Sequence, residues 1–251
     1  GIAILCVLLL SIYGCSFYIA HKHAIAAGNA LQAVSFEKPD QELNELFQAS
    51  LQHYERATQL NPLNAEYHAY LAYIYALFYL SLDEAGHELS DQVYQKAVSA
   101  IEKAAELKPY SSQIHSSLFD TTKMLGDFTL ALQQAEGLVQ SNPNDINAYE
   151  TLVNVLEAGL EYCQEEGNNE QTALLAHELV EVQSKLEEQK SKIDQDKPWN
   201  GPPLTLSAEV QYSIAKANYL LGNYEESLAI FRIASPDLFN EEVNENTPQP
   251  V

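Results

Sequence analysis

The chain has 251 residues, of which 46% are hydrophobic and 19% are charged, which suits one sizeable packed unit. Asp and Glu number 35 against 13 Lys and Arg, so the formal charge is −22. A surface of this sign repels phosphate groups, and we therefore exclude nucleic acid as a partner. Cys6, Cys15 and Cys163 form no CxxC pair and predict no disulfide framework.

The chain begins with an uncharged apolar segment, residues 2–20. As a helix this segment spans roughly 28 Å, close to the ~30 Å hydrocarbon core of a bilayer. Tyr13, Phe17 and Tyr18 gather at its far end, where aromatic side chains prefer the membrane interface. We therefore predict a transmembrane or apolar helix over residues 1–22, with membrane contact through residues 2–20. The acidic sequence behind it favours a following domain on the outer side of the membrane, extracytoplasmic or at the cell surface.

Two other interpretations use the same residues. Gly14-Cys15 loosely resembles a lipoprotein processing site, although the apolar run continues past Cys15. Pilin-type helices are also apolar at the start of the mature chain, but they usually carry a glutamate at the fifth position, where Leu5 stands here. Since the chain does not start with Met, we expect Gly1 to begin a fragment or a processed chain.

A helical repeat follows the apolar segment. Lys108-Pro109 and Asn142-Pro143 lie 34 residues apart, and 34 is the period of the tetratricopeptide repeat. Between them, large residues fall where the first helix packs and Gly126-Asp127 falls at the turn. Small residues fall where the second helix crosses. We predict an all-α tetratricopeptide-repeat solenoid of helix-turn-helix units over residues 23–239, a class that usually binds partners.

The repeats are predicted near residues 24–64, 65–111, 112–145, 146–193 and 206–236, and a disordered acidic tail over residues 240–251. In the second repeat an insertion, LFYLSLDEAGHEL, lengthens both helices or loops out. Within it, Asp83, Glu84 and His87 would suit a metal ion, but a solvated turn is the simpler interpretation. The fourth repeat loses the pattern at EEGNNEQ. Four tyrosines are predicted to be packing residues: Tyr67, Tyr75, Tyr149 and Tyr219.

No catalytic constellation is evident in the sequence. HExxH, GxSxG and the phosphate-binding GxxxxGK are all missing, and His21 and His23 do not share a helix face. We therefore predict that this chain is not an enzyme and that it uses no cofactor or metal. The predicted site is the concave groove lined by the first helix of each repeat, which would hold a protein or a glycan. Its residues are Glu66, Tyr73, Gln113, Asp120, Lys123, Asn147, Glu150, Asn154 and Glu157.

Four segments carry a family resemblance: the apolar helix 2–20, ERATQLNPLNAEYHAYLA at 55–72, AIEKAAELKPYS at 100–111, and KPWNGPPLTLSAEVQYSIAKANYLLGNYEESLAIF at 197–231. Their order resembles the C-terminal portion of O-antigen ligase-like bacterial membrane proteins, in which extracytoplasmic tetratricopeptide repeats follow the last transmembrane helices. The resemblance covers nearly the whole chain, and the Trp199 linker with the last repeat is its distinctive part. It implies an accessory role in cell-surface polysaccharide assembly. The family's glycosyl transfer belongs to a polytopic membrane part, so no catalytic residue is carried over.

Two functions follow from the sequence. The first is an extracytoplasmic, membrane-anchored scaffold that mediates protein-protein or glycan interactions. The second is a subunit of an extracellular pilus-like filament, in which the apolar helix packs between subunits by self-assembly.

Overall fold

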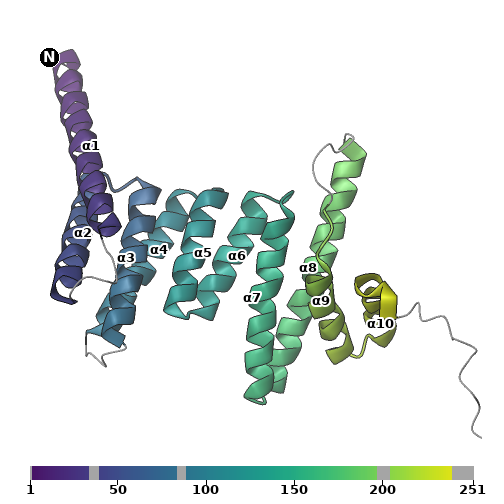
Figure 1. The fold of residues 1–251 in the computed structure, drawn as a ribbon. Helices are drawn as coiled ribbons and strands as arrows, with labels where there is room; N and C mark the ends of the chain where they lie inside the picture. Colours follow the sequence, from purple (N-terminus) through teal and green to yellow (C-terminus); the bar gives the residue numbers. More distant parts are fainter. Residues whose placement is uncertain (1, 34–39, 84–88, 197–203, 239–251) are drawn as a thin grey trace, which may run out of the picture. The chain divides into compact units, whose positions relative to one another are not determined.

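The computed structural model describes residues 2–33, 40–83, 89–196 and 204–238, without the side chains of 2–10, 12, 40–41, 43–44, 83, 194–196 and 238. All regular secondary structure in these ranges is helical, which confirms the all-α prediction. The Trp199 linker and the tail over residues 240–251 lie outside the described residues. The elements are α1 (Ile2–Gln32), α2 (Asp40–Leu60), α3 (Ala65–Asp83), α4 (Ser90–Leu107), α5 (Ser112–Leu125), α6 (Phe128–Ser141), α7 (Ile146–Glu165), α8 (Asn169–Asp196), α9 (Ala208–Leu220), α10 (Tyr224–Ala234) and the 3₁₀ helix η1 (Pro236–Leu238) (Figure 1).

The chain divides into two compact units, Gly1–Gly137 and Leu138–Val251. In the first, α1 pairs with α2 and α3 with α4, while α5 packs against α3 and α4. In the second, α7 pairs with α8 and α9 with α10, while α7 and α8 both contact α9. Helix α7 begins 34 positions after α5, which is the spacing of a tetratricopeptide-type repeat. Within each unit, therefore, each hairpin packs onto the first helix of the next: α2 contacts α3, α3 and α4 contact α5, and α7 and α8 contact α9.

The start of each hairpin is fixed by a side-chain cap. Asn64, Ser111 and Asp145 each accept a hydrogen bond from a backbone N–H in the first turn of α3, α5 and α7. Each stands two residues after a landmark proline, and these prolines are Pro62, Pro109 and Pro143. A cap of this kind stabilises a helix by about 1 kcal/mol.

The turn inside three hairpins depends on glycine. Gly126, Gly167 and Gly222 have φ angles of 67°, 70° and 82°, and this left-handed conformation favours glycine because it has no Cβ. In each case the next N–H bonds back to the carbonyl five residues earlier. The prediction that the pattern is lost at EEGNNEQ is therefore wrong, because Gly167 makes the same turn and α8 follows it. Sequence reasoning missed this turn because α7 and α8, with 20 and 28 residues, are longer than α5 and α6, with 14 each.

The second repeat accommodates its extra residues by lengthening α3 to 19 residues and α4 to 18. Residues 77–83 of the inserted segment continue α3, whereas Glu84 and His87 lie outside the described residues.

Three of the four tyrosine predictions are confirmed and one is wrong. Tyr67, Tyr75 and Tyr149 are buried packing residues, as predicted. The prediction for Tyr219 is wrong: its side chain is 61% exposed and meets only the ring edge of Tyr224 among the described aromatic rings. In the described part of the chain, α10 and η1 follow α9.

Helix α1 is one continuous helix of 31 residues, so the apolar segment runs without a break into the first hairpin. The hydroxyl of Ser16 donates to the Leu60 carbonyl at 2.8 Å, and that of Ser50 donates to the Ala27 carbonyl at 3.0 Å, which ties α1 to α2. Figure 1 shows the amino-terminal part of α1 extending beyond the end of α2.

The predicted membrane span is only partly within the described region. In the residues that were described, no helix has both the length and the apolar character needed to cross a membrane. The side chains of residues 2–10 and 12, which belong to the predicted segment 2–20, lie outside that description.

Candidate protein-binding surfaces

The predicted groove residues of the first unit lie on two neighbouring helices. They are Glu66 and Tyr73 on α3, and Gln113, Asp120 and Lys123 on α5. Tyr73 is half-buried and the other four are exposed. The carboxylate of Glu66 lies 3.0 Å from the ammonium group of Lys108, and both side chains are half exposed, so this ion pair contributes little stability, roughly 0–1 kcal/mol.

The predicted groove residues of the second unit all lie on α7: Asn147, Glu150, Asn154 and Glu157. Two of them have structural roles there. The amide of Asn147 donates to the capping carboxylate of Asp145 at 3.0 Å, and Glu150 accepts a 2.7 Å hydrogen bond from the backbone N–H of Ser207 ahead of α9. These two side chains therefore hold helix ends, whereas Asn154 is exposed.

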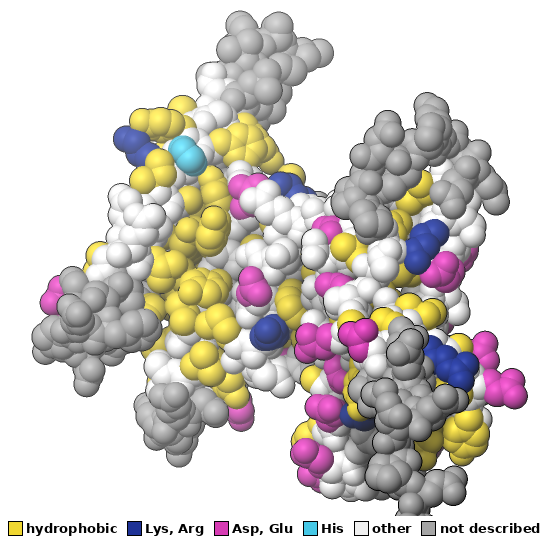
Figure 2. All heavy atoms as spheres, turned by 45° about the vertical axis from the view of Figure 1, so that its right-hand side comes forward, with side chains coloured by type: hydrophobic (Ala, Val, Ile, Leu, Met, Phe, Trp, Pro, Cys, Tyr) yellow, Lys and Arg dark blue, Asp and Glu magenta, His cyan; other side chains and the backbone are white. Residues whose placement is uncertain are grey.

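The first unit presents an apolar face that the groove prediction covered only in part. Tyr70, Tyr73, Leu77 and Leu80 recur at helical spacing on α3, and we call them the α3 stripe. Tyr70 is 50% exposed and stacks on Tyr54 of α2 at a centroid distance of 5.4 Å, while the other three are half-buried. Figure 2 shows a broad group of hydrophobic side chains on the part of the molecule that carries the first unit.

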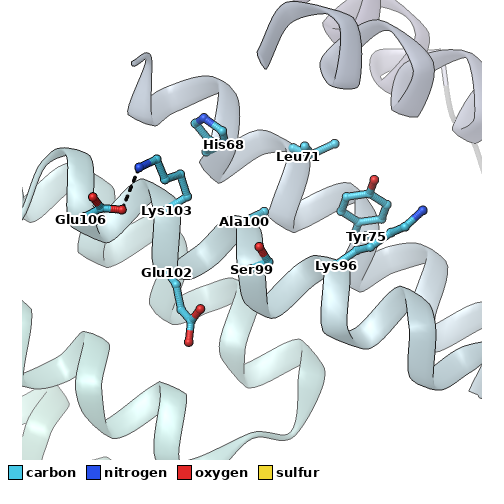
Figure 3. Close-up of a pocket in the computed structure, with 9 residues that line it drawn as sticks. All are labelled: His68, Leu71, Tyr75, Lys96, Ser99, Ala100, Glu102, Lys103 and Glu106. Atoms are coloured by element: carbon cyan, nitrogen blue, oxygen red, sulfur yellow. Dashed lines mark hydrogen bonds and ion pairs between the residues drawn. The ribbon is translucent and has the colours of Figure 1, made fainter. Parts of the chain in front are cut away.

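The opposite face of α3 opens into a pocket of about 470 Å³ (Figure 3). Tyr75 lies two residues after Tyr73, which is a rotation of about 200° around the helix. The lining residues are His68, Leu71 and Tyr75 of α3 and Lys96, Ser99, Ala100, Glu102, Lys103 and Glu106 of α4. This volume lies in the range of small-ligand sites, roughly 300–1,000 Å³.

Hydrogen bonds and ion pairs fix most polar groups of this pocket. The Tyr75 hydroxyl donates to Glu55 at 2.5 Å. The ammonium group of Lys103 pairs with Glu106 at 2.8 Å. The Nε2 atom of His68 lies 3.0 Å from the carbonyl oxygen of Pro62, so this nitrogen carries the proton and donates it.

The pocket keeps its two titratable ring side chains uncharged near neutral pH. Burial lowers the pKa of His68 below its usual value; the hydrogen bond to Pro62 opposes this shift and the nearby charge of Lys103 adds to it. Burial, and next the hydrogen bond to Glu55, raise the pKa of Tyr75. These two rings are therefore neutral hydrogen-bonding groups, whereas the charges of the lining come from its Lys and Glu side chains.

Sequence reasoning missed this pocket, although a signal was present. Six residues after each landmark proline stands a side chain that bonds to the carbonyl oxygen of that proline. The three pairs are His68 with Pro62, His115 with Pro109, and Tyr149 with Pro143. A polar or phenolic group at this register therefore marks the space between the two helices of a repeat.

A histidine pair joins α1 and α2. The Nδ1 atoms of His23 and His53 lie 2.9 Å apart, which sequence spacing could not indicate because the residues belong to different helices. Within the described ranges, no three His, Cys, Asp or Glu side chains come together as a metal site, and Cys15 and Cys163 are free thiols.

No protein-family model and no curated protein matches the chain. Solved structures with a similar backbone include two crystal structures of MamA, with 14% and 15% sequence identity. They cover 95% and 82% of this chain and 98% and 97% of their own. A third is YrrB, described as a TPR protein with an unusual peptide-binding site, at 17% identity over 80% of this chain and 82% of its own. The TM-score is 0.40 in all three cases.

Proposed function

We propose that this chain is a helical-repeat scaffold that holds a protein partner on the α3 stripe. The observation that carries the proposal is the α3 stripe, in which Tyr70 is 50% exposed and Tyr73, Leu77 and Leu80 are half-buried, on a helix that is apolar on all sides over residues 69–80. Contiguous accessible apolar side chains of this kind are typical of interaction surfaces, and tyrosine is enriched in them. The charge of −22 favours a partner that carries Lys and Arg around its apolar residues.

A position-specific crosslink tests this proposal. A photoreactive phenylalanine analogue at Tyr73 should form a discrete crosslinked product in the native cells. The same analogue at Tyr162, which is 65% exposed on α7, should not. The Leu77→Ser/Leu80→Ser double variant should abolish the Tyr73 product. A product of equal yield from both positions would mean that the α3 stripe binds no specific protein partner.

For the anchor, we propose that residues 2–20 hold the scaffold in a bacterial cell membrane with the repeats on the extracytoplasmic side. The uncharged sequence of the segment supports this, and so does the continuity of α1 with the first hairpin. The full chain should float with lipid vesicles in a density gradient, and a chain that begins at His21 should not. Protease added to intact cells should degrade the repeats.

The resemblance to O-antigen ligase-like proteins supports a finer proposal, in which the scaffold assists cell-surface polysaccharide assembly and a glycan is an additional partner. Deleting residues 24–238 from the native protein, while keeping residues 1–22, should lower the amount or length of surface polysaccharide. Unchanged polysaccharide in that strain would separate the scaffold from this pathway.

The alternative function is that of a filament subunit. Tyr13, Phe17, Tyr18 and Ile19 of α1 are between 40% and 61% exposed, and such side chains could pack against α1 of other copies. This proposal expects regular fibres of native material in the electron microscope. A chain that stays monomeric in detergent at every concentration would exclude it.

A further inference from the structure

The α5–α6 hairpin contains a filled slot between its two helices. His115, Leu118, Gln134 and Gly137 bound this slot. The His115 ring is 5% exposed, with Nε2 3.0 Å from the Pro109 carbonyl and Nδ1 2.9 Å from the side-chain amide of Gln134. The ring also lies so close to Gly137 that a Cβ there would stand 2.4 Å from it. The carboxamide of Gln134 therefore completes the hydrogen bonding of the histidine.

The α3–α4 hairpin has the same slot in an open form. Counted forward from the proline ahead of each hairpin, His68 corresponds to His115. Counted back from the proline behind it, Ala100 corresponds to Gln134 and Lys103 to Gly137. Ala100 is too short to reach the histidine, and the Lys103 side chain turns to Glu106 at 2.8 Å (Figure 3). The pocket of about 470 Å³ occupies the place of the missing carboxamide. In the described part of the chain, Nδ1 of His68 has no hydrogen-bond partner.

The second unit repeats this arrangement independently. Counted from the turn glycines, Gln211, Ile214, Ile230 and Ile233 of α9 and α10 correspond to the four slot residues of α5–α6. All four line a cavity of about 200 Å³, whose other lining residues come from α8 and from Thr205 and Leu206 ahead of α9. Gln211 donates through its amide nitrogen to the Leu206 carbonyl at 2.8 Å. Its amide oxygen is buried and is the one buried side-chain polar atom without a partner among the described residues.

The vacant groups of the two open slots have the same chemistry. His68 donates through Nε2, so Nδ1 of the neutral ring is an acceptor, and the free atom of Gln211 is also an acceptor. A ligand must therefore bring an N–H or O–H donor on a group slender enough to enter between two helices. In the filled slot, the chain places a carboxamide there. The NH₂ end of that amide serves as the donor when the amide is turned by 180°, an assignment that heavy-atom geometry leaves equivalent.

We propose that the α3–α4 pocket binds the side-chain carboxamide of a glutamine or asparagine in a peptide, with its NH₂ group donating to Nδ1 of His68. The apolar part of that side chain would lie on Leu71 and Ala100. Ser99 and Glu102 of the lining offer further hydrogen-bonding groups to the peptide backbone. This site is separate from the proposed function, because it lies on the face of α3 opposite the α3 stripe.

The test is an NMR titration of the full chain in detergent micelles with ¹⁵N-labelled histidine. The probe is N-acetyl-glutamine methylamide. A saturable shift of the His68 Nδ1 resonance is expected, without a shift of His115. The matched carboxylate, N-acetyl-glutamate methylamide, should shift His68 at least tenfold less at equal concentration. No saturable shift, or an equal shift with the carboxylate, would overturn the proposal.

Two variants and one sugar complete the test. The Ala100→Gln/Lys103→Gly variant rebuilds the filled slot, so the His68 resonance should no longer respond to the probe. Ala100→Val narrows the pocket with a smaller change and should weaken the response at least threefold, which keeps the test informative if the double variant does not fold. A response that persists in a folded variant contradicts the assignment. N-acetylglucosamine also carries a carboxamide, and tighter binding of this sugar would overturn the peptide assignment. None of these results changes the crosslinking expected at Tyr73, so the two proposals are tested separately.

Discussion

The α3–α4 and α5–α6 hairpins each begin with a proline, a side-chain cap and a histidine, yet one has an open slot and the other a filled slot. In α5–α6 the histidine is buried against Gly137 and Gln134. In α3–α4 the corresponding positions hold Lys103 and Ala100, and a pocket remains. Two side chains of the second helix therefore decide whether the space between the helices is core or binding site.

The strongest way to break this comparison is to remove the two histidines. His115→Ala should destabilise the protein by about 3 kcal/mol, because it leaves a cavity and an unpaired buried carboxamide. His68→Ala should cost much less, about 0.5 kcal/mol, because the ring borders solvent. Urea denaturation of both variants measures the difference. Equal losses would show that the two slots are energetically alike.

The second largest effect should come from Gly137→Ala. The new Cβ would stand 2.4 Å from Cε1 of the His115 ring, so the ring or the helix must shift. We expect a loss of about 2 kcal/mol from this overpacking. Gly28→Ala is the control, since its Cβ would meet only the Tyr54 hydroxyl at 3.9 Å. The thermal unfolding midpoint of Gly137→Ala should therefore fall, whereas that of Gly28→Ala should rise or stay the same.

The shared turn can be tested by replacing its glycine. Gly126→Ala and Gly222→Ala each force a residue with a Cβ into a positive φ, 67° and 82°, and each should cost about 1 kcal/mol. Because the turn is common to both units, the two losses should agree within about 0.5 kcal/mol. Circular dichroism during chemical denaturation measures both, and a negligible loss at either site would show that this turn tolerates other conformations.

The smallest expected effect is on the pH dependence of stability, and it tests the environment of His68 in the open slot. The pKa of His68 is lowered in the folded state, so the unfolded chain binds its proton first as the pH falls below the ordinary value of about 6.5. Stability that is present above this pH should therefore decrease as the pH falls through the lowered value. Solvent screening limits the effect to a few tenths of a kcal/mol. His68→Gln should reduce the slope of stability against pH between 5 and 7. His23, whose pKa is also lowered, keeps its own contribution in both proteins, and an unchanged slope would contradict this assignment.

Local signals in the sequence predicted the helical hairpins because each signal acts over a few residues. The caps after Pro62, Pro109 and Pro143 and the glycine of Gly222-Asn223 determine where helices begin and turn. The Gly167 turn was missed because the repeats were recognised by a fixed number of residues per repeat. The three turns share instead a glycine with a polar residue after it. The burial of Tyr219 was inferred from its position in the repeat alone, and the structure leaves that side chain exposed.

The candidate sites were less predictable than the fold. The groove residues on α3 followed from position in the repeat, but the hydrogen bond from the Ser207 backbone to Glu150 joins segments 57 residues apart. The open slot depends on a comparison between two hairpins of different length. The prolines align Ala100 and Lys103 with Gln134 and Gly137, but only the structure shows that the latter pair fills the space beside a histidine and that the former leaves a pocket.

Because α1 is continuous, it forms a rigid connection between the surroundings of its apolar half and the first hairpin. An α-helix transmits rotation, since each residue advances the chain by about 100° around the axis. One residue inserted ahead of Ser16, whose hydroxyl is bonded to α2, would therefore turn the hairpin, and the α3 stripe with it, by about 100°, whereas four inserted residues would turn it by only about 40°. The direction in which the scaffold presents its binding surface is thus set by the number of residues in α1.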